Sequence, residues 1–309
     1  SKAVGIKVIA EMRRASRPVL MVLLIGTAEV ALLLFALVPA PWNAAFLFLN
    51  GLPLGMVWGI VFSYIEGRRT TDLTGLVLCS SFVLASGLVK TAGKMVLNWG
   101  VSEFAMPFVT GALFFLPLLG FLWMLESLPP PSPEDIRQRT ERVPMSRRDR
   151  RRFFARFAPG LVLMLAAYIL LTAFRDFRDN YMADIWATLG KGRSSTIFTA
   201  TELPVAVGVL LVLGLLLRVR DNFRALVINH LAVLGGFGLV GLSTLLFQKG
   251  LLGPTAWMIL AGFGLFLGYI PFNGVLFDRL IAAFGIKSNA GYLIYLADFL
   301  GYLASVGVL

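Results

Sequence analysis

Charged side chains interrupt the long apolar segments of this sequence at a few places, and the densest group lies in TAFRDFRDNYMADIW. Its clustered charged residues are Arg175, Asp176, Arg178 and Asp179. Arg175 and Asp179 are spaced to pair on one helix face, and Tyr168 and Thr172 lie on a compatible face within two turns. A guanidinium group binds carboxylates or phosphates through paired hydrogen bonds. This group therefore predicts either an anion-binding site or a salt-bridge cluster used for packing or gating.

Two lysines and one glutamate also stand inside apolar segments, where a central charge costs about 2.5–3.5 kcal/mol on insertion scales. Lys90 and Lys94 are four residues apart and share a helix face with Ser86. They are either side chains that reach the outer headgroups or a functional pair. Glu202 precedes Pro204, whose ring removes a backbone donor and frees carbonyl groups nearby. We expect Glu202 to be a proton-coupling acid or the partner of Lys90.

Four further polar residues inside apolar segments are weaker candidates: Glu29, His230, Asn273 and Asp298. Glu29 and Asp298 are candidate proton sites, or they hydrogen-bond to a neighbouring helix. His230 is more typical of a hydrogen bond between helices than of a proton relay. One histidine and one cysteine cannot form a disulfide framework or a Cys/His metal site within the chain, and we expect no metal and no cofactor.

The segments that carry these residues are long enough to cross a bilayer. The 309 residues are 58% hydrophobic and 15% charged, well below the charge content of a soluble domain. Nine apolar stretches reach the ~20 residues that a spanning helix needs. We place them at 19–39, 44–65, 73–97, 105–126, 158–181, 195–217, 223–247, 255–277 and 288–309. The sequence thus predicts an all-α polytopic membrane helix bundle, with the lipid bilayer as its partner.

The basic residues are divided unequally between the two sides of the predicted bundle. If residues 1–18 are cytoplasmic, the loops on that side hold 21 of the 28 Lys and Arg residues, and the opposite loops hold 3. This asymmetry is the positive-inside pattern. It predicts a multi-pass protein of the cell (inner) membrane with residues 1–18 and 127–157 in the cytoplasm. The net charge of +11 is spread between apolar runs, which does not favour a nucleic-acid partner.

A long basic loop divides the chain into two parts. Residues 127–157 begin with prolines that stop a helix and continue as the arginine-rich RQRTERVPMSRRDRRRF. We interpret this loop as a solvated linker, with a regulatory or anionic-lipid-binding role as the alternative. Four predicted spans precede it and five follow.

Short loops combined with one long basic cytoplasmic loop resemble the major facilitator superfamily, whose twelve spans form two six-helix halves joined by such a loop. Segments such as NGLPLGMVWG, EGRRTTD and FRDFRDN favour a bacterial branch of facilitator-like proteins. The resemblance covers the whole chain. It implies an N-terminal half at 1–126 (helices three to six), a linker at 127–157 and a C-terminal half at 158–309 (helices seven to eleven). The sequence would then be a fragment without helices one, two and twelve.

This resemblance implies a transporter that moves a small solute by alternating access, and the basic side chains favour an organic anion with proton coupling. It also places the third and sixth predicted spans side by side, so we expect a Lys90–Glu202 or a Lys94–Asp179 pair. One alternative is a transport-inactive scaffold or sensor. Another is a membrane enzyme acting on lipids or glycans. The enzyme is disfavoured because the sequence shows no nucleophile–base arrangement and no long outer loop, so we do not expect an enzyme.

Overall fold

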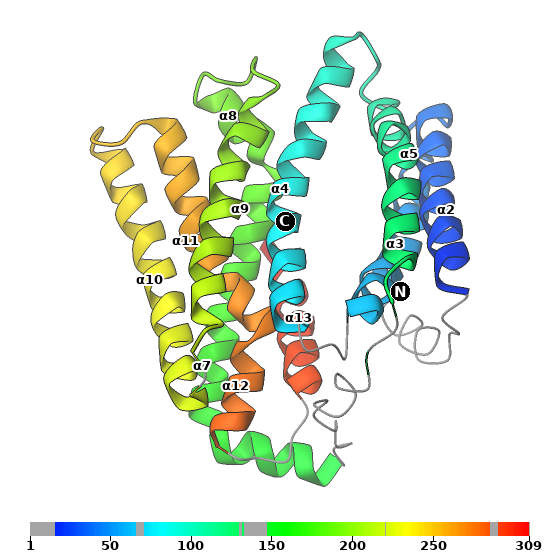
Figure 1. Cartoon of the computed structure of the whole chain (residues 1–309). Coiled ribbons are helices and arrows are strands. Elements are labelled where there is room, and N and C mark those ends of the chain that lie inside the picture. Colours follow the sequence, from blue (N-terminus) through cyan, green and yellow to red (C-terminus); the bar gives the residue numbers. More distant parts are fainter. Residues whose placement is uncertain are drawn as a thin grey trace. The chain divides into compact units, whose positions relative to one another are not determined.

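The computed structural model describes residues 16–65, 71–129, 132, 147–219, 221–284 and 290–308, and the elements in these ranges are helices (Figure 1). The helices are α2 (Arg17–Leu37), α3 (Ala44–Ile65), α4 (Thr71–Asn98), α5 (Met106–Glu126), α7 (Arg147–Asn180), α8 (Met182–Thr188), α9 (Ile197–Leu216), α10 (Asn222–Gln248), α11 (Pro254–Gly274), α12 (Leu276–Ala283) and α13 (Ala290–Val308). The predicted all-α membrane bundle is confirmed.

Eight of the described helices are long and apolar enough to cross a membrane, and they match the first eight predicted spans. The predicted ninth span corresponds to helix α13, and within its described residues Leu296–Gly307 forms a shorter apolar segment. Large apolar side chains also face outward along these helices. Leu231, Leu234, Leu242 and Leu245 of α10 are all more than half exposed. Such a surface is stable in lipid rather than in water, so the protein is a multi-pass membrane protein.

The chain forms two compact units, and the first contains residues Ser1–Thr71 and Val89–Arg139. In this unit α2 packs against α3 and α5 around a core that includes Met21, Ile60 and Leu122. Ala31 of α2 is fully buried, and its small side chain lets the neighbouring helices approach closely. Asn50 Nδ2 donates to the backbone oxygen of Ala28 at 3.0 Å, which joins α3 to α2 through a polar contact.

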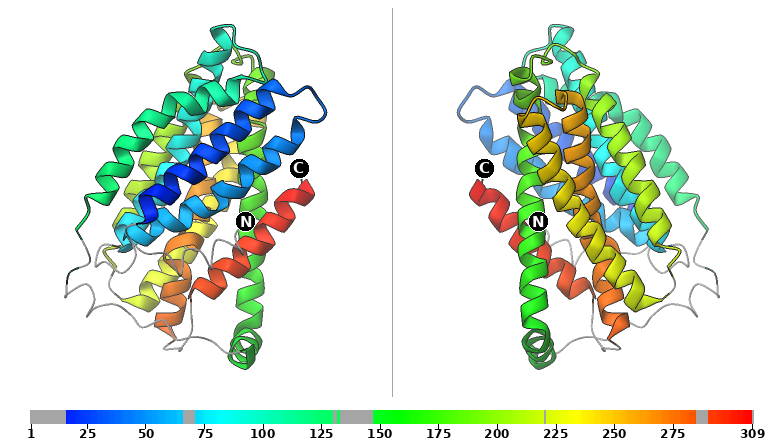
Figure 2. Two further views of the ribbon diagram at one scale, coloured as in Figure 1. Left: turned by 90° about the vertical axis from the view of Figure 1, so that its right-hand side faces the viewer. Right: turned by 90° about the vertical axis from the view of Figure 1, so that its left-hand side faces the viewer.

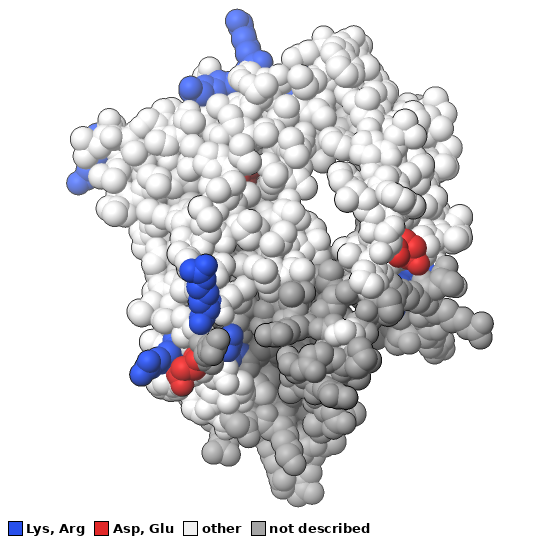
Figure 3. Space-filling view, in the orientation of Figure 1, with Lys and Arg blue, Asp and Glu red and all other residues white. Residues whose placement is uncertain are grey.

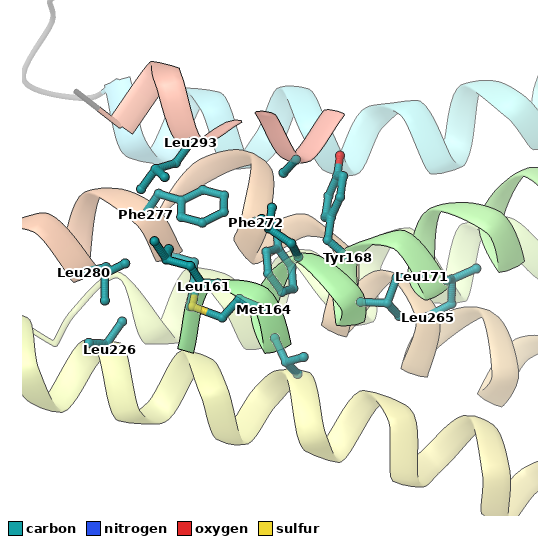
Figure 4. Packing of buried hydrophobic residues seen from close by; sticks show 14 residues of the cluster. Leu161, Met164, Tyr168, Leu171, Leu226, Leu265, Phe272, Phe277, Leu280 and Leu293 are labelled. Atoms are coloured by element: carbon teal, nitrogen blue, oxygen red, sulfur yellow. The ribbon is translucent and has the colours of Figure 1, made fainter. Parts of the chain in front are cut away.

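The second unit contains residues Asp72–Leu88 and Thr140–Leu309. Its larger core joins α7, α10, α11, α12 and α13, and Figure 4 shows how side chains such as Tyr168, Phe272 and Phe277 fill it. A second cluster packs Leu76 and Val83 of α4 against α9. The first half of α4 therefore belongs with the C-terminal helices, whereas we had assigned all of this helix to an N-terminal half at 1–126.

Glycines bring α10 and α11 into backbone contact inside the second unit. A side chain at Gly264 would place its Cβ 2.6 Å from the backbone oxygen of Gly236. Only glycine is compatible with this approach, so the two helices lie closer together than larger side chains would permit. α11 also contacts α9 and α7, which makes it the central helix of this unit.

Helix α7 begins inside the segment that we had predicted as linker. It runs for 34 residues from Arg147, ten residues before the predicted boundary at residue 157, and it contains Pro159. Its first turns run in a different direction from the rest of the helix, so that α7 is bent (Figures 1 and 2). Proline removes a backbone hydrogen bond and commonly kinks a helix, which explains a bend in this region. The rest of the predicted linker lies mostly outside the described residues.

The helix ends of the second unit carry the predicted charges. At one end, Arg279 Nη1 donates to Asn222 Oδ1 at 2.7 Å, which places the connection between α9 and α10 beside α12. Lys249 follows α10, and Lys191 and Arg193 precede α9, at the opposite helix ends. In Figure 3 the visible flanks of the helices are largely uncharged, and Lys and Arg gather near helix ends. This alternation within the unit agrees with the predicted order of its spans. Residues 1–15 of the basic N-terminal segment lie outside the described residues.

Candidate functional site

The end of α7 carries a buried ion pair with α9. Arg178 Nη2 lies 2.6 Å from Glu202 Oε1, and the two side chains are only 4% and 1% exposed. The same nitrogen donates to the backbone oxygen of Met258 on α11 at 3.3 Å. Removing two charges from water is costly, and only close pairing with further hydrogen bonds offsets that cost. This pair therefore needs the exact juxtaposition of three helices.

Two glycines make room for the ion pair. A Cβ at Gly87 of α4 would lie 2.8 Å from Glu202 Cβ, and a Cβ at Gly262 of α11 would lie 2.6 Å from Arg178 Nη2. Real Cβ atoms do not come so close to other heavy atoms, so any side chain at Gly87 would push the glutamate aside. The backbones of α4 and α11 thus form a close cradle around the two charged groups.

A second ion pair lies one turn earlier on α7. Arg175 Nε and Nη2 lie 2.8 and 2.7 Å from Asp176 Oδ1, and Arg175 Nη1 donates to the Tyr269 hydroxyl. The guanidinium carbon is 4.6 Å from the centre of the Tyr269 ring and 6.0 Å from that of Tyr302. Ser305 donates to Asp176 Oδ2 at 2.5 Å. The arginine is held between a carboxylate and aromatic rings, in an arrangement that attracts cations electrostatically.

Tyr168 connects this pair to a second carboxylate. Its side chain is 1% exposed, and its hydroxyl donates to Asp298 Oδ1 at 2.6 Å. The same hydroxyl lies 3.2 Å from Asn273 Oδ1 and 3.2 Å from the Tyr269 hydroxyl. A hydroxyl has one hydrogen, so it donates to one of these acceptors at a time. We use the name polar chain for the connected residues Asp298, Tyr168, Tyr269, Arg175, Asp176 and Ser305.

The last charged residue of the α7 group is joined to α4. Ser86 donates to Asp179 Oδ1 at 2.5 Å. With Arg178 bound to Glu202, the end of α7 is tied to α4 and α9 through charge-assisted hydrogen bonds, which are stronger than neutral ones. Thr172 lies between these contacts and Tyr168, and its hydroxyl bonds to the backbone oxygen of Tyr168 at 2.8 Å.

Most of the predicted site residues come together in the second unit. They are Ser86, Tyr168, Thr172, Arg175, Asp176, Arg178, Asp179, Glu202, Asn273 and Asp298. The pairing within the α7 group differs from the spacing argument: Arg175 makes its ion pair with adjacent Asp176, where we had expected Asp179. In this position the guanidinium of Arg175 lies near the rings of Tyr269 and Tyr302.

Other predicted residues lie outside this group. His230 Nδ1 is 2.8 Å from the backbone oxygen of Leu226 on its own helix. This contact is not the hydrogen bond between helices that we had predicted. Glu29, Lys90 and Lys94 belong to the first unit. The Lys90–Glu202 and Lys94–Asp179 pairs each join one unit to the other and stay predictions, while Glu202 pairs with Arg178 within its own unit.

Sequence reasoning missed Tyr269, Tyr302, Ser305 and the glycines of the cradle. The signal for the first was present, since Tyr269 and Asn273 are four residues apart and share a face of α11. Asp298, Tyr302 and Ser305 follow the same rule on α13, at spacings of four and seven. Gly87 and Gly262 carried no comparable signal, because their role depends on the helix opposite each of them.

The chemistry available to this site is acid–base and electrostatic. The described residues contain no group of three or more His, Cys, Asp or Glu side chains that could hold a metal ion. Along the polar chain, two tyrosine hydroxyls and the guanidinium of Arg175 lie between the carboxyl groups of Asp298 and Asp176. Such an arrangement can bind an anion at an arginine and can move protons between neighbouring oxygen atoms.

Comparison with known proteins defines the family of the chain without indicating an activity. No curated protein and no solved structure matches the sequence. One family model, described as a family of unknown function (DUF5690), matches residues 1–309. The match extends over the whole chain and includes both units. The protein, a multi-pass membrane protein, therefore belongs to the DUF5690 family.

Proposed function

We propose that this protein is a secondary transporter of the major facilitator type, which moves a small organic anion together with protons by alternating access. The observation that carries the proposal is the group of two arginines and their carboxylate partners within the spans of the second unit. Charged groups at such a depth are expensive and commonly mark substrate or proton pathways.

The arginines favour an anionic solute. The Arg175 side chain is 20% exposed, whereas that of Arg178 is 4% exposed, so Arg175 is the more accessible of the two. Its planar group matches the geometry of a carboxylate, and the rings of Tyr269 and Tyr302 would pack against the apolar part of an organic acid. We assign Arg175 to the solute and Arg178 to the structure around it.

The carboxyl groups favour proton coupling. Asp176 and Asp298 lie at the two ends of a hydrogen-bonded series that passes through Arg175 and two tyrosines. Glu202, which we had expected to be a proton-coupling acid or the partner of Lys90, pairs with Arg178 and is 1% exposed. Asp176 is partly accessible, with 18% of its side chain exposed, and it is the carboxylate paired with Arg175. Proton coupling through Asp176 is therefore the form of the proposal that the contacts favour.

Helix breaks and close helix contacts supply the means of movement. Pro204 interrupts the hydrogen bonding of α9 two residues after Glu202, and Pro271 precedes the end of α11. The glycine contact between α10 and α11 lacks interlocking side chains. Alternating access in this transporter class is largely rigid rocking of one helix group against another around a central site. We place the protein in the cell (inner) membrane with residues 1–18 and 127–157 in the cytoplasm.

Reconstitution into liposomes tests this proposal. Liposomes that contain the full-length protein would be loaded with a pH-sensitive dye. Lactate, gluconate, benzoate and citrate would then be added outside under an inward proton gradient. We expect accumulation of at least one anion with a matching proton flux, and loss of both in Arg175→Gln. No accumulation and no proton flux with any solute tested, in protein shown to be folded, would contradict it.

One observation favours a second candidate, a transport-inactive scaffold or sensor. The Arg178–Glu202 pair is buried and packs closely against Gly87 and Gly262, as expected for a permanently assembled contact. In a scaffold, Arg175→Gln would leave anion and proton movements at the background level of empty liposomes, as in the wild type. The liposome experiment therefore separates the two candidates.

A further inference from the structure

We infer that Asp176 and the carboxylate of the transported anion compete for Arg175, so that one proton binds to Asp176 whenever one anion binds to the arginine. This inference rests on the proposed function and names the residues that would couple its two substrates. It predicts a fixed exchange of partners at one guanidinium group, rather than two separate sites for proton and solute.

The contacts of Arg175 identify the competing position. Its Nε and Nη2 form the edge that grips a carboxylate, and both point to the same oxygen of Asp176, at 2.8 and 2.7 Å. Nη1 on the other side is occupied by the Tyr269 hydroxyl. Because Tyr269 already engages Nη1, we assign the incoming carboxylate to the edge that Asp176 now occupies. The solute and Asp176 therefore cannot both hold that edge in the observed geometry.

Protonation resolves this competition without leaving a buried net charge. In the observed state the negative Asp176 balances the positive Arg175. When a proton adds to one Asp176 oxygen, the ion pair is lost, and the solute carboxylate takes over the balance of charge. The net charge of the pair with its ligands is zero before and after. Because an unbalanced charge inside a membrane protein is costly, either step alone is unfavourable and the two occur together.

Neighbouring groups leave Asp176 as the direct competitor. From α11 the pair faces Tyr269, and from α13 it faces Tyr302 and the hydroxyl of Ser305. Asp298, also on α13, connects to Arg175 through the hydroxyls of Tyr168 and Tyr269.

On α7 itself, the adjacent charged groups have other contacts. Arg178 is bound to Glu202, and Asp179 accepts from Ser86. Asp176 is thus the carboxylate in direct contact with the guanidinium of Arg175. Its second oxygen is held by Ser305, which would keep the carboxyl group in place after the exchange.

The test measures anion affinity as a function of pH. The strongest binder among radiolabelled lactate, gluconate, benzoate and citrate would serve as the probe, with the purified full-length protein between pH 5 and 9. In the wild type we expect one proton to be taken up per carboxylate bound. The affinity then falls about tenfold per pH unit in the range where Asp176 is ionised, as linkage of one proton requires.

Asp176→Asn is the decisive variant, because asparagine cannot compete as an anion. We expect it to bind the probe at all pH values as tightly as the wild type does at low pH, with no pH slope. Asp184→Asn is the matched control, since Asp184 is exposed on α8 and should leave the wild-type slope unchanged. Arg175→Gln should lose binding at every pH. A wild-type pH slope in Asp176→Asn would overturn the inference.

A second variant covers the case in which Asp176→Asn does not fold. Ser305→Ala removes a donor that stabilises the negative form of Asp176. The negative carboxylate then competes less well for Arg175, so the probe should bind more tightly than to the wild type at neutral pH, and an unchanged affinity would overturn the inference. If the wild type binds and transports none of the probes, the proposed function itself fails. If the wild type transports a probe but the variants keep the wild-type dependence on pH, only the exchange of partners at Arg175 is rejected.

Discussion

Two glutamates inside the apolar helices show how differently the two units treat the same kind of residue. Glu29 on α2 and Glu202 on α9 each pack against a glycine of another helix, Gly111 and Gly87 respectively. Glu202 has Arg178 at 2.6 Å. Glu29 Oε1 is buried without a hydrogen-bond partner in the part of the chain that the structure describes. A glycine on the facing helix therefore provides room for a carboxylate in both units. In the second unit an arginine also balances the charge of the carboxylate.

The largest expected effect comes from leaving one member of the Arg178–Glu202 pair alone. Arg178→Met would bury Glu202 without its partner and should lower the free energy of unfolding by about 3–5 kcal/mol. The double variant Arg178→Met with Glu202→Leu should recover most of this loss, since an apolar pair of similar size needs no neutralisation. Unfolding in mixed detergent–SDS micelles would measure both. A double variant no more stable than the single one would show that the pair is not the cause.

A smaller effect is expected at the glycine beside Glu202. Gly87→Ala would bring a Cβ to 2.8 Å from Glu202 Cβ and 3.0 Å from the backbone oxygen of Phe198. Such overpacking typically costs about 1–3 kcal/mol. Gly214→Ala on α9 is the control, because nothing lies within 4 Å of its Cβ position, and it should stabilise the helix by about 0.5–1 kcal/mol. Equal stability changes in the two variants, in the same micelle assay, would contradict the close packing described above.

The comparison itself is tested at Glu29. Glu29→Gln keeps the shape of the side chain and removes its charge, and Oε1 has no described donor to lose. We expect the free energy of unfolding to stay within about 1 kcal/mol of the wild type or to rise. Glu202→Gln, which breaks an ion pair, should be clearly destabilising. If both substitutions cost the same, the contrast between the units is wrong.

The smallest effect is expected at His230, a polar residue of the second unit that lies outside the polar chain. Its Nδ1 contacts a backbone oxygen of its own helix, and its ring is half-buried. His230→Gln should change stability by less than about 0.5 kcal/mol, as is usual for sites away from buried networks. Anion transport in liposomes should also be unchanged. A large loss in either assay would extend the functional group beyond the residues identified above.

The membrane spans could be predicted because their signal is local. A run of some twenty apolar residues has few alternatives to a spanning helix, so eight of the nine predicted spans correspond to long apolar helices. The start of α7 at Arg147 was missed because proline and charge were interpreted as linker, although arginine is a good helix former. The division of α4 between two units depends on which surfaces it packs against, and a single sequence does not contain that information.

For the candidate site, residue types were predictable and partners were not. A charge inside an apolar segment is visible in the sequence, so Arg178 and Glu202 were both identified. Their pairing spans 24 positions, and it depends on how α7 and α9 cross. Tyr269 was missed because a tyrosine in an apolar helix is ordinary until its hydroxyl meets Arg175. Helix spacing predicts which residues share a face, and only packing determines what that face meets.

The bent helix α7 runs without a break in the chain of helical residues from its basic first turns to the charged site. Residues 147–156 contain six arginines and continue as one helix into the span that carries Arg175. Sliding this helix inward would draw arginines into hydrocarbon at roughly 2.5–3.5 kcal/mol each, whereas tilting it would not. α7 is thus suited to act as a pivot rather than a piston. The lipid-binding alternative predicted for this basic segment would therefore act on the same helix that carries Arg175.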